Sequence, residues 1–150
     1  MRNKDRESRP KVVLVTRTLV KNDKAQILVL KRSNERSYLP GRWELPGGKL
    51  DIGQDASSAL EREVLEETGL VVIPTDRMAY WHGEIISSGK YKGLPYIILV
   101  GTAKTIAGEV TISNEHTAYK WVSKAQALEL DLTSECRAAI SVLTKNLKND

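Results

Sequence analysis

The sequence contains one cysteine, no phenylalanine and no long apolar run. A single cysteine, Cys136, excludes a disulfide within the chain, and its helical spacing with Ala139 and Ile140 favours a core thiol over a reactive one. No apolar run approaches the ~20 residues of a membrane-spanning helix, so no membrane contact is expected. Segment 1–10 is charged and lacks the apolar centre of a secretory signal, which predicts a flexible arm on a cytoplasmic protein.

Length and charge bound the chain further. With 150 residues, no internal repeat and no low-complexity tract, the sequence predicts a single domain over residues 1–150. The net charge of +4 suits anionic substrates. Much of the excess lies in the two tails, however, so nucleic acid is not expected as a partner. We expect a monomer or a homodimer.

The stretch REVLEETG concentrates acidic residues in a helix-forming segment. When residues 55–68 are placed on a helix at ~100° per residue, one apolar stripe forms from Ala56, Ala59, Leu60 and Val64. Glu67 falls inside this stripe, and Glu63 and Glu66 fall at its edge. Glu61 points away from it. Because a buried, unpaired charge is very costly, carboxylates that converge on the core side predict a bound cation.

Residues with known positional preferences delimit this helix. Asp55 is a favourable N-cap, and Gly69 can adopt the left-handed conformation that ends a helix. Ahead of the helix, the loop PGGKLDIG offers Gly47, Gly48 and Gly53, whose backbone N–H groups could approach an anion. A glycine-rich loop alone is typical of ordinary turns. Three converging carboxylates close behind it favour a functional role.

The other segments alternate between strand and helix patterns. Apolar, β-branched runs predict strands near 11–20, 26–32, 42–45, 70–73, 78–86 and 94–104, followed by the segments EVTI and HTAYKWV. Helices are predicted near 124–130 and 133–147. The run 94–104 is almost entirely apolar, which indicates a central strand. A mixed β-sheet with helices on both faces buries such strands, so the predicted fold class is α/β.

The run from Gly48 to Leu70 resembles the signature of the Nudix hydrolases, Gx5Ex7REUxEExGU, in which U is a bulky aliphatic residue. Gly48 matches the first glycine, REVLEETGL matches the second half, and the spacing between them agrees. One position departs, because Gln54 stands where the family has its first glutamate. The upstream GRWELPGG and the downstream EHTAYKWV also look like this family, so the resemblance extends across most of the chain.

The resemblance implies an α/β/α sandwich that hydrolyses a nucleoside diphosphate linked to another moiety, using Mg²⁺ and sometimes Mn²⁺. By position it implies metal ligands at Glu63, Glu66 and Glu67, together with Gly48. Such hard cations prefer oxygen ligands, and Mg²⁺ keeps several waters while it bridges protein to phosphate. Arg62 is then expected to orient one of these glutamates. The reaction would be attack of water on phosphorus, assisted by the metal.

The residue that takes the proton from the attacking water is left open by the sequence. Inside the signature, Glu63 or Glu66 could act as the general base. Outside it, the polar segment SNEHTAY offers Glu115 as a base or an accessory metal ligand, since many family members place an extra acid in such a loop. His116 is the other candidate base in this segment, although we interpret it as a surface histidine or one that supports a neighbouring group.

Contacts to the rest of the substrate are less well defined. Aromatic residues that could stack on a base are Trp43, Tyr80, Trp81, Tyr91 and Tyr96. Aromatics in strands more often belong to the core, however. Cations that could bind phosphate are Lys31, Arg32, Arg36 and Arg42, and a solvated strand edge explains them equally well. The predicted substrate-binding set consists of Arg32, Arg42, Trp43, Gly47 and Gly48.

The predicted substrate depends on which additional sequence signatures of the family are missing from the chain. It has no convincing match to the family's extra signatures for NADH, ADP-ribose or dinucleoside polyphosphates, and the spacing of RSNERSYLPGRWELPGG does not fit the coenzyme A pattern. A small, undecorated domain is the format of MutT-type enzymes. We therefore predict hydrolysis of a nucleoside triphosphate to the monophosphate and pyrophosphate. The alternatives are a nucleotide-sugar or ADP-ribose pyrophosphatase, and a Nudix-fold sensor that binds nucleotide without turnover.

Overall fold

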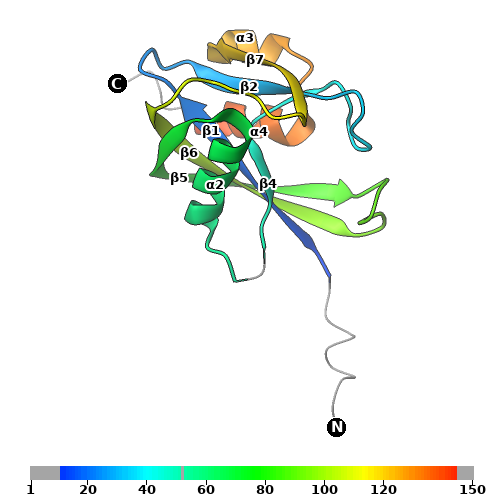
Figure 1. Cartoon of the computed structure of the whole chain (residues 1–150). Helices are drawn as coiled ribbons and strands as arrows, with labels where there is room; N and C mark the ends of the chain where they lie inside the picture. Colours follow the sequence, from blue (N-terminus) through cyan, green and yellow to red (C-terminus); the bar gives the residue numbers. More distant parts are fainter. Residues whose placement is uncertain (1–10, 52, 145–150) are drawn as a thin grey trace.

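The computed structural model of the chain describes residues 11–51 and 53–144, with segment 76–84 described by its backbone alone. Within these residues, seven strands form one mixed sheet, with helices on both of its faces (Figure 1). This arrangement confirms the predicted α/β fold. None of the described helices is long and apolar enough to cross a membrane. The predicted N-terminal arm, 1–10, lies outside the described residues.

The elements follow the predicted alternation. The strands are β1 (Val13–Lys21), β2 (Ile27–Arg32), β3 (Trp43–Glu44), β4 (Gly47–Lys49), β5 (Val71–Ile85), β6 (Pro95–Ala107) and β7 (His116–Val122). The helices are α2 (Ala56–Thr68), α3 (Lys124–Glu129) and α4 (Ser134–Leu143). The main path of the sheet runs β3-β2-β1-β6-β5, with β4 on β1 and β7 on β2. Strand β6 lies between β1 and β5, which confirms the prediction of a central strand.

The sheet is forked where β1 and β2 separate. Strand β1 runs parallel to β6 along its whole length, but it meets β2 only at the pair Lys21↔Ile27. Beyond that pair the two strands diverge, and the segment 43–49 enters the space between them. There β3 pairs with β2, and β4 pairs with β1. The fork therefore holds the glycine-rich segment in the middle of the sheet.

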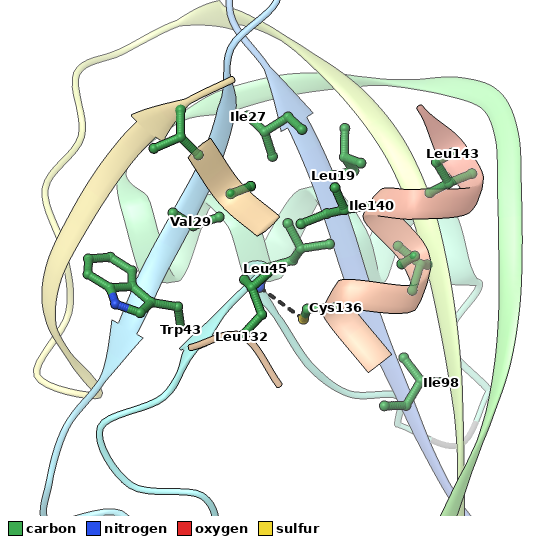
Figure 2. Close-up of a cluster of buried hydrophobic side chains, with 14 of the residues drawn as sticks. Leu19, Ile27, Val29, Trp43, Leu45, Ile98, Leu132, Cys136, Ile140 and Leu143 are labelled. Atoms are coloured by element: carbon green, nitrogen blue, oxygen red, sulfur yellow. Dashed lines mark hydrogen bonds between the residues drawn. The ribbon is translucent and has the colours of Figure 1, made fainter. Parts of the chain in front are cut away.

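Two apolar cores cover the two faces of the sheet. The α4-side core contains Val13 and Leu19 of β1, Ile98 of β6 and residues of α3 and α4. Figure 2 shows Leu45 and Cys136 of this core, where the Leu45 N–H donates to Cys136 Sγ at 3.2 Å. The α2-side core consists of Val20, Leu28, Leu30, Val64, Leu70, Val72 and Ala103. Cys136 is completely buried in the α4-side core, which confirms the predicted core thiol, and this burial raises the pKa of the thiol to about 12.

Helix α2 has the predicted boundaries. Asp55 is its N-cap and accepts a hydrogen bond from the Ser58 N–H at 3.1 Å. At the other end Gly69 has φ of 72°, and its N–H donates to Leu65 O at 2.9 Å. The phase of the helix is also as expected, because Glu67 is buried while Glu61 is exposed.

Three predicted boundaries differ from the structure. The strands predicted at 70–73 and 78–86 are one continuous strand, β5, whose register shifts between Pro74 and Met78. The segment EVTI is not a strand, because its backbone pairs with the end of α2. There Thr111 N–H donates to Thr68 O at 2.8 Å, one of the carbonyls that a helix end leaves unpaired. Helix α4 ends at Leu143 with Thr144 as its C-cap, and residues 145–147 of the predicted 133–147 helix lie outside the described residues.

Candidate active site

A cleft opens at the fork between the two halves of the sheet. Its walls are the glycine loop (residues 46–51), the inner side of α2 and the first turn of α4. Strands β1 and β6 form its floor, and the loops around 36–38 and 86–91 complete its rim. The cleft therefore brings together segments from the whole length of the chain.

Two carboxylates of α2 face the glycine loop. Glu67 is only 5% exposed, and its Oε2 accepts a hydrogen bond from the Gly47 N–H at 3.0 Å. Burial raises the pKa of the Glu67 carboxyl to about 8, although the charge of Arg17 opposes this shift. Burial also raises the pKa of Glu63, with Arg62 opposing it. Burial therefore disfavours the negative charge of both acids, and a bound cation would stabilise that charge.

Gly47 and Gly48 are required because neighbouring atoms lie too close to the loop for a side chain at either position. A Cβ at Gly48 would lie 2.7 Å from the carboxyl group of Glu63, so a side chain there would displace this carboxylate. A Cβ at Gly47 would lie 1.9 Å from the backbone oxygen of Thr16, which cannot move aside cheaply. The two positions thus let α2 and β1 approach the loop from opposite sides.

Arg62 holds the exposed flank of this group. Its guanidinium lies 3.1 Å from Glu63 Oε1 and 3.3 Å from Glu66 Oε1. It also donates to Gln54 Oε1 at 3.2 Å, so Gln54 is hydrogen-bonded into the same group. The Glu66 side chain is 56% exposed and does not line the cleft. The structure therefore brings Glu63 and Glu67 to the loop and leaves Glu66 beside Arg62.

The donor set is compatible with a divalent cation that binds together with a substrate. Among the described residues, no three Asp, Glu, His or Cys side chains form a ready-made metal group. Mg²⁺ does not require such a cage, because it commonly binds one or two carboxylates and completes its shell with waters and phosphate oxygens. Glu63 and Glu67, both destabilised as anions and both at the cleft, suit that role.

A buried ionic network lies behind the glycine loop and centres on Glu44. Glu44 Oε2 is 3.1 Å from Arg17 and 2.9 Å from Arg32, and Glu44 Oε1 is 2.9 Å from His116 Nε2. Burial alone would raise the pKa of Glu44, but Arg17, His116 and Arg32 together outweigh it and lower the pKa to about 2. The sequence analysis did not predict this network, although charged residues inside otherwise apolar strands were a visible sign of it.

Arg17 connects the network to the glycine loop. One of its nitrogens donates to Leu45 O and to Gly47 O, both at 3.3 Å, while the other pairs with Glu44. The Gly47 N–H in turn donates to Glu67. Glu44 and Arg17 therefore fix the backbone that positions Glu67.

Glu115 and His116 have different surroundings. The Glu115 side chain is 44% exposed at the rim of the cleft and lies 3.3 Å from Arg36. His116 is only 5% exposed and contacts Glu44. His116 thus supports a neighbouring group, whereas the Glu115 carboxylate is accessible from the cleft.

The predicted substrate-binding residues are divided by the structure. Gly47, Gly48 and Arg32 line the cleft, although Arg32 is occupied by Glu44 and donates to Tyr38 O at 3.0 Å. Arg42 does not line the cleft and pairs instead with Asp131 at 3.1 Å and with the Leu132 carbonyl. Trp43 belongs to the α4-side core.

Strand alternation explains this outcome, which corrects the expectation that Trp43 and Arg42 face the substrate. Neighbouring residues of β3 point to opposite sides, so Glu44 faces the cleft while Trp43 faces the core. Of the other proposed stacking residues, Tyr91 and Tyr96 line the cleft, and the side chains of Tyr80 and Trp81 lie outside the described residues.

Known proteins resemble this chain both in sequence and in structure. The sequence pattern of the NUDIX domain matches residues 11–141. The chain is 28% identical over 127 residues to the nucleoside triphosphatase NudI of Escherichia coli O139:H28, covering 81% of this chain and 89% of that protein. A crystal structure of a MutT protein from Methanosarcina mazei superposes with a TM-score of 0.79 at 27% identity, covering 94% and 98% of the two chains.

A further structural match concerns the fold alone. A binary complex of the Caenorhabditis elegans Ap4A hydrolase superposes with a TM-score of 0.73 at 24% identity. The match covers 91% of this chain and 98% of the hydrolase. This match shows a shared fold and does not indicate the substrate, which depends on the residues of the cleft.

Proposed function

The chain belongs to the NUDIX domain family and is a Nudix hydrolase of nucleoside diphosphate derivatives, and on this premise we propose that it hydrolyses a nucleoside triphosphate to the monophosphate and pyrophosphate. The observation that carries the proposal is the convergence of Glu63 and Glu67 on the glycine loop inside the cleft. The similarity to a nucleoside triphosphatase at 28% identity supports the choice of substrate class.

The cation would be Mg²⁺, with Mn²⁺ as an alternative, held by Glu63 and Glu67 with the Gly48 backbone beside them. Glu66 would complete the set through a water or after its Arg62 contact opens. Bound there, the metal supplies charge neutralisation for the phosphates and a lowered pKa for the attacking water.

The chain's own residues would position the metal-binding carboxylates and take a proton from the attacking water. Arg17 and Glu44 hold the loop carbonyls, so the Gly47 N–H stays directed at Glu67. Arg62 restrains Glu63 from the outer side. Glu115 accepts the proton of the attacking water from the cleft rim, and we favour it over Glu63 because Glu63 is committed to the cation. We further propose a cytoplasmic monomer or homodimer without a nucleic-acid or membrane partner.

A panel of nucleotides tests the proposal against its rivals. Purified protein with Mg²⁺ is given ribo- and deoxyribonucleoside triphosphates, ADP-ribose and nucleotide sugars, and the products are identified by chromatography. Pyrophosphate with a nucleoside monophosphate supports the proposal. A nucleoside monophosphate with a sugar phosphate supports the nucleotide-sugar or ADP-ribose alternative. Binding without turnover of any compound supports the sensor.

Glu115→Gln is expected to lower kcat by about a hundredfold to ten-thousandfold, with a smaller change in KM. A general base acts mainly in the transition state, and its contribution is typically in this range. Initial rates across nucleotide concentrations at saturating Mg²⁺ give both constants. The matched substitution of Arg36 by glutamine removes the ion-pair partner of Glu115 and should affect kcat less. An unchanged kcat in Glu115→Gln, with a severe loss in His116→Ala, would reverse the assignment within this loop.

Gln54→Glu is expected to change turnover at saturating Mg²⁺ by less than about tenfold, under ~1.4 kcal/mol of barrier. Gln54 Oε1 already accepts from Arg62 at 3.2 Å and from the Asp51 N–H at 3.4 Å, and a glutamate oxygen can accept the same two bonds. The added charge should mainly lower the Mg²⁺ concentration for half-maximal activity. A metal titration of both proteins measures this. A wild type inert at every Mg²⁺ and Mn²⁺ concentration but rescued by Gln54→Glu would instead favour a non-catalytic protein.

A further inference from the structure

Two backbone segments at the rim of the cleft place Arg36 beside Glu115. The Ser33 N–H donates to Glu115 O at 2.9 Å, and the Arg36 N–H donates to Ser33 O at 3.1 Å, so one tight turn joins the two segments. On the other side of Arg36, Ser88 Oγ donates to Ser37 O at 3.2 Å. The backbone at Arg36 is therefore held from both sides, while its side chain is 41% exposed and lines the cleft.

The Arg36 guanidinium has a weak partner. Among the side chains that the structure describes, it bonds only to Glu115 Oε1, at 3.3 Å. Both side chains are partly exposed, and ion pairs in such surroundings contribute little because water competes for each partner. The other three arginines of the cleft bind the buried Glu44 or carboxylates of α2. Arg36 is therefore the cleft arginine whose partner a substrate can replace most readily.

The pair of Arg36 and Glu115 lies close to the proposed cation position. The charge of Glu115 acts on Glu63, one of the two proposed metal ligands, and Arg36 contacts Glu115 directly. A nucleotide bound through a cation at Glu63 and Glu67 therefore brings phosphate oxygens within reach of the long Arg36 side chain. Phosphate is also the stronger partner, because it carries more charge than a carboxylate and the arginine fork can bind two of its oxygens at once.

We propose that Arg36 is a phosphate-binding residue that moves from Glu115 to the phosphate chain when a nucleotide binds, an inference that rests on the proposed hydrolysis of nucleoside triphosphates. Without substrate, the ion pair occupies the Glu115 carboxylate. In the complex, the phosphate takes the guanidinium, and the freed carboxylate can accept a hydrogen bond from the attacking water. Substrate binding and the release of the general base are thereby coupled.

The division between KM and kcat in Arg36→Gln is the first test. This variant loses a phosphate contact but leaves Glu115 unpaired, so KM for the nucleoside triphosphate should rise about fivefold to fiftyfold while kcat changes less than about threefold. A residue that only holds Glu115 in place would give a lowered kcat and an unchanged KM, which would overturn the inference. Lys24→Gln removes the same charge from the exposed turn between β1 and β2, and this matched control should change neither constant.

Direct binding of a probe that has no base separates competition from simple charge repulsion. The Kd of inorganic tripolyphosphate with Mg²⁺ is measured by isothermal titration calorimetry for the wild type, Arg36→Gln, Glu115→Gln and the double variant. Competition predicts that Glu115→Gln tightens binding, and that the tightening is about twofold to fivefold larger with Arg36 present than in Arg36→Gln, since only then must binding break an ion pair. Equal or larger tightening in the Arg36→Gln background, or an unchanged Kd in Arg36→Gln itself, would overturn the inference.

The two experiments keep this inference distinguishable from the proposed function. Both side chains are partly exposed, so neither substitution should prevent folding. Competition seen with tripolyphosphate in a protein that hydrolyses no triphosphate would refute the proposed function and leave Arg36 as a phosphate-binding residue. Normal triphosphate hydrolysis without coupling between Arg36 and Glu115 would overturn the inference alone. If tripolyphosphate does not bind, the division between KM and kcat still decides.

Discussion

Glu67→Gln is expected to lower kcat for nucleoside triphosphate hydrolysis by a hundredfold or more at saturating Mg²⁺, corresponding to a barrier increase of at least ~2.7 kcal/mol. The neutral amide can still accept the Gly47 hydrogen bond, so the glycine loop keeps its support. What the substitution removes is the buried negative charge that a cation would require. The expected loss is therefore in catalysis and metal affinity rather than in folding.

The same substitution should stabilise the metal-free protein at alkaline pH. The folded-state pKa of Glu67, about 8, lies above the ordinary value of 4.5, so folding favours the protonated carboxyl. Its stabilising contribution is complete below pH 4.5 and is lost as pH rises through 8. At 1.36 kcal/mol per pKa unit the loss is at most on the order of 5 kcal/mol. Glutamine does not titrate, so the variant's Tm should exceed the wild type's by a margin that grows from pH 5 to pH 8.

Thermal melts at pH 5, 6.5 and 8, with EDTA and with Mg²⁺, measure this difference in Tm between Glu67→Gln and the wild type. Hydrolysis rates are measured on the same two proteins. Mg²⁺ should raise the Tm of the wild type more than that of the variant, because the ion binds the ionised carboxylate. Glu61→Gln, at an exposed position of the same helix, is the control and should alter neither rate nor margin. Glu66→Gln should lower turnover without the pH-dependent margin, since Glu66 is not buried. Near-normal hydrolysis in both Glu66→Gln and Glu67→Gln at limiting Mg²⁺ would contradict the assignment of these glutamates as metal ligands.

Local periodicity was sufficient to predict α2 and the direction of its acids. A helix has a fixed angular repeat, so the apolar stripe alone indicated that Glu67 faces inward and Glu61 outward. The caps at Asp55 and Gly69 depend on adjacent residues and were also predictable. Such inferences succeed because all of the interacting residues lie within a few positions of one another.

The network behind the loop could not be predicted in this way. Arg17 and Glu44 come from different strands, and they meet only because β1 and β2 separate and admit the segment 43–49. Pairing at a fork depends on the register of the whole sheet, which short-range patterns do not specify. The burial of Glu135 in α4 was only weakly indicated by the sequence. Glu135 lies three positions after Leu132 and four before Ala139, both of which are buried. An acid in a first helical turn is more often a solvated partner of the helix dipole.

Glu44→Gln is expected to cost about 3 to 5 kcal/mol of unfolding free energy at pH 7. The substitution leaves the buried guanidinium groups of Arg17 and Arg32 without their shared counter-charge, and breaking a buried ion pair from one side typically costs this much. It also frees the Arg17 side chain to move, which should weaken its hydrogen bonds to Leu45 O and Gly47 O. We therefore expect kcat to fall with stability, although no cleft carboxylate of α2 has been changed.

The dependence on pH separates this role from that of Glu67, because the two carboxylates are shifted in opposite directions. The pKa of Glu44 is lowered from 4.5 to about 2, so its stabilising contribution is present above pH 4.5 and is lost as pH falls through 2. Urea unfolding at pH 7, 4.5 and 3 should thus show that the difference in unfolding free energy between the wild type and Glu44→Gln becomes smaller as the pH falls. The full decrease should be on the order of 3 kcal/mol. Glu61→Gln again serves as the control. A gap that stays constant from pH 7 to pH 3 would mean that shape and packing, rather than the charge of Glu44, hold the fork closed around the glycine loop.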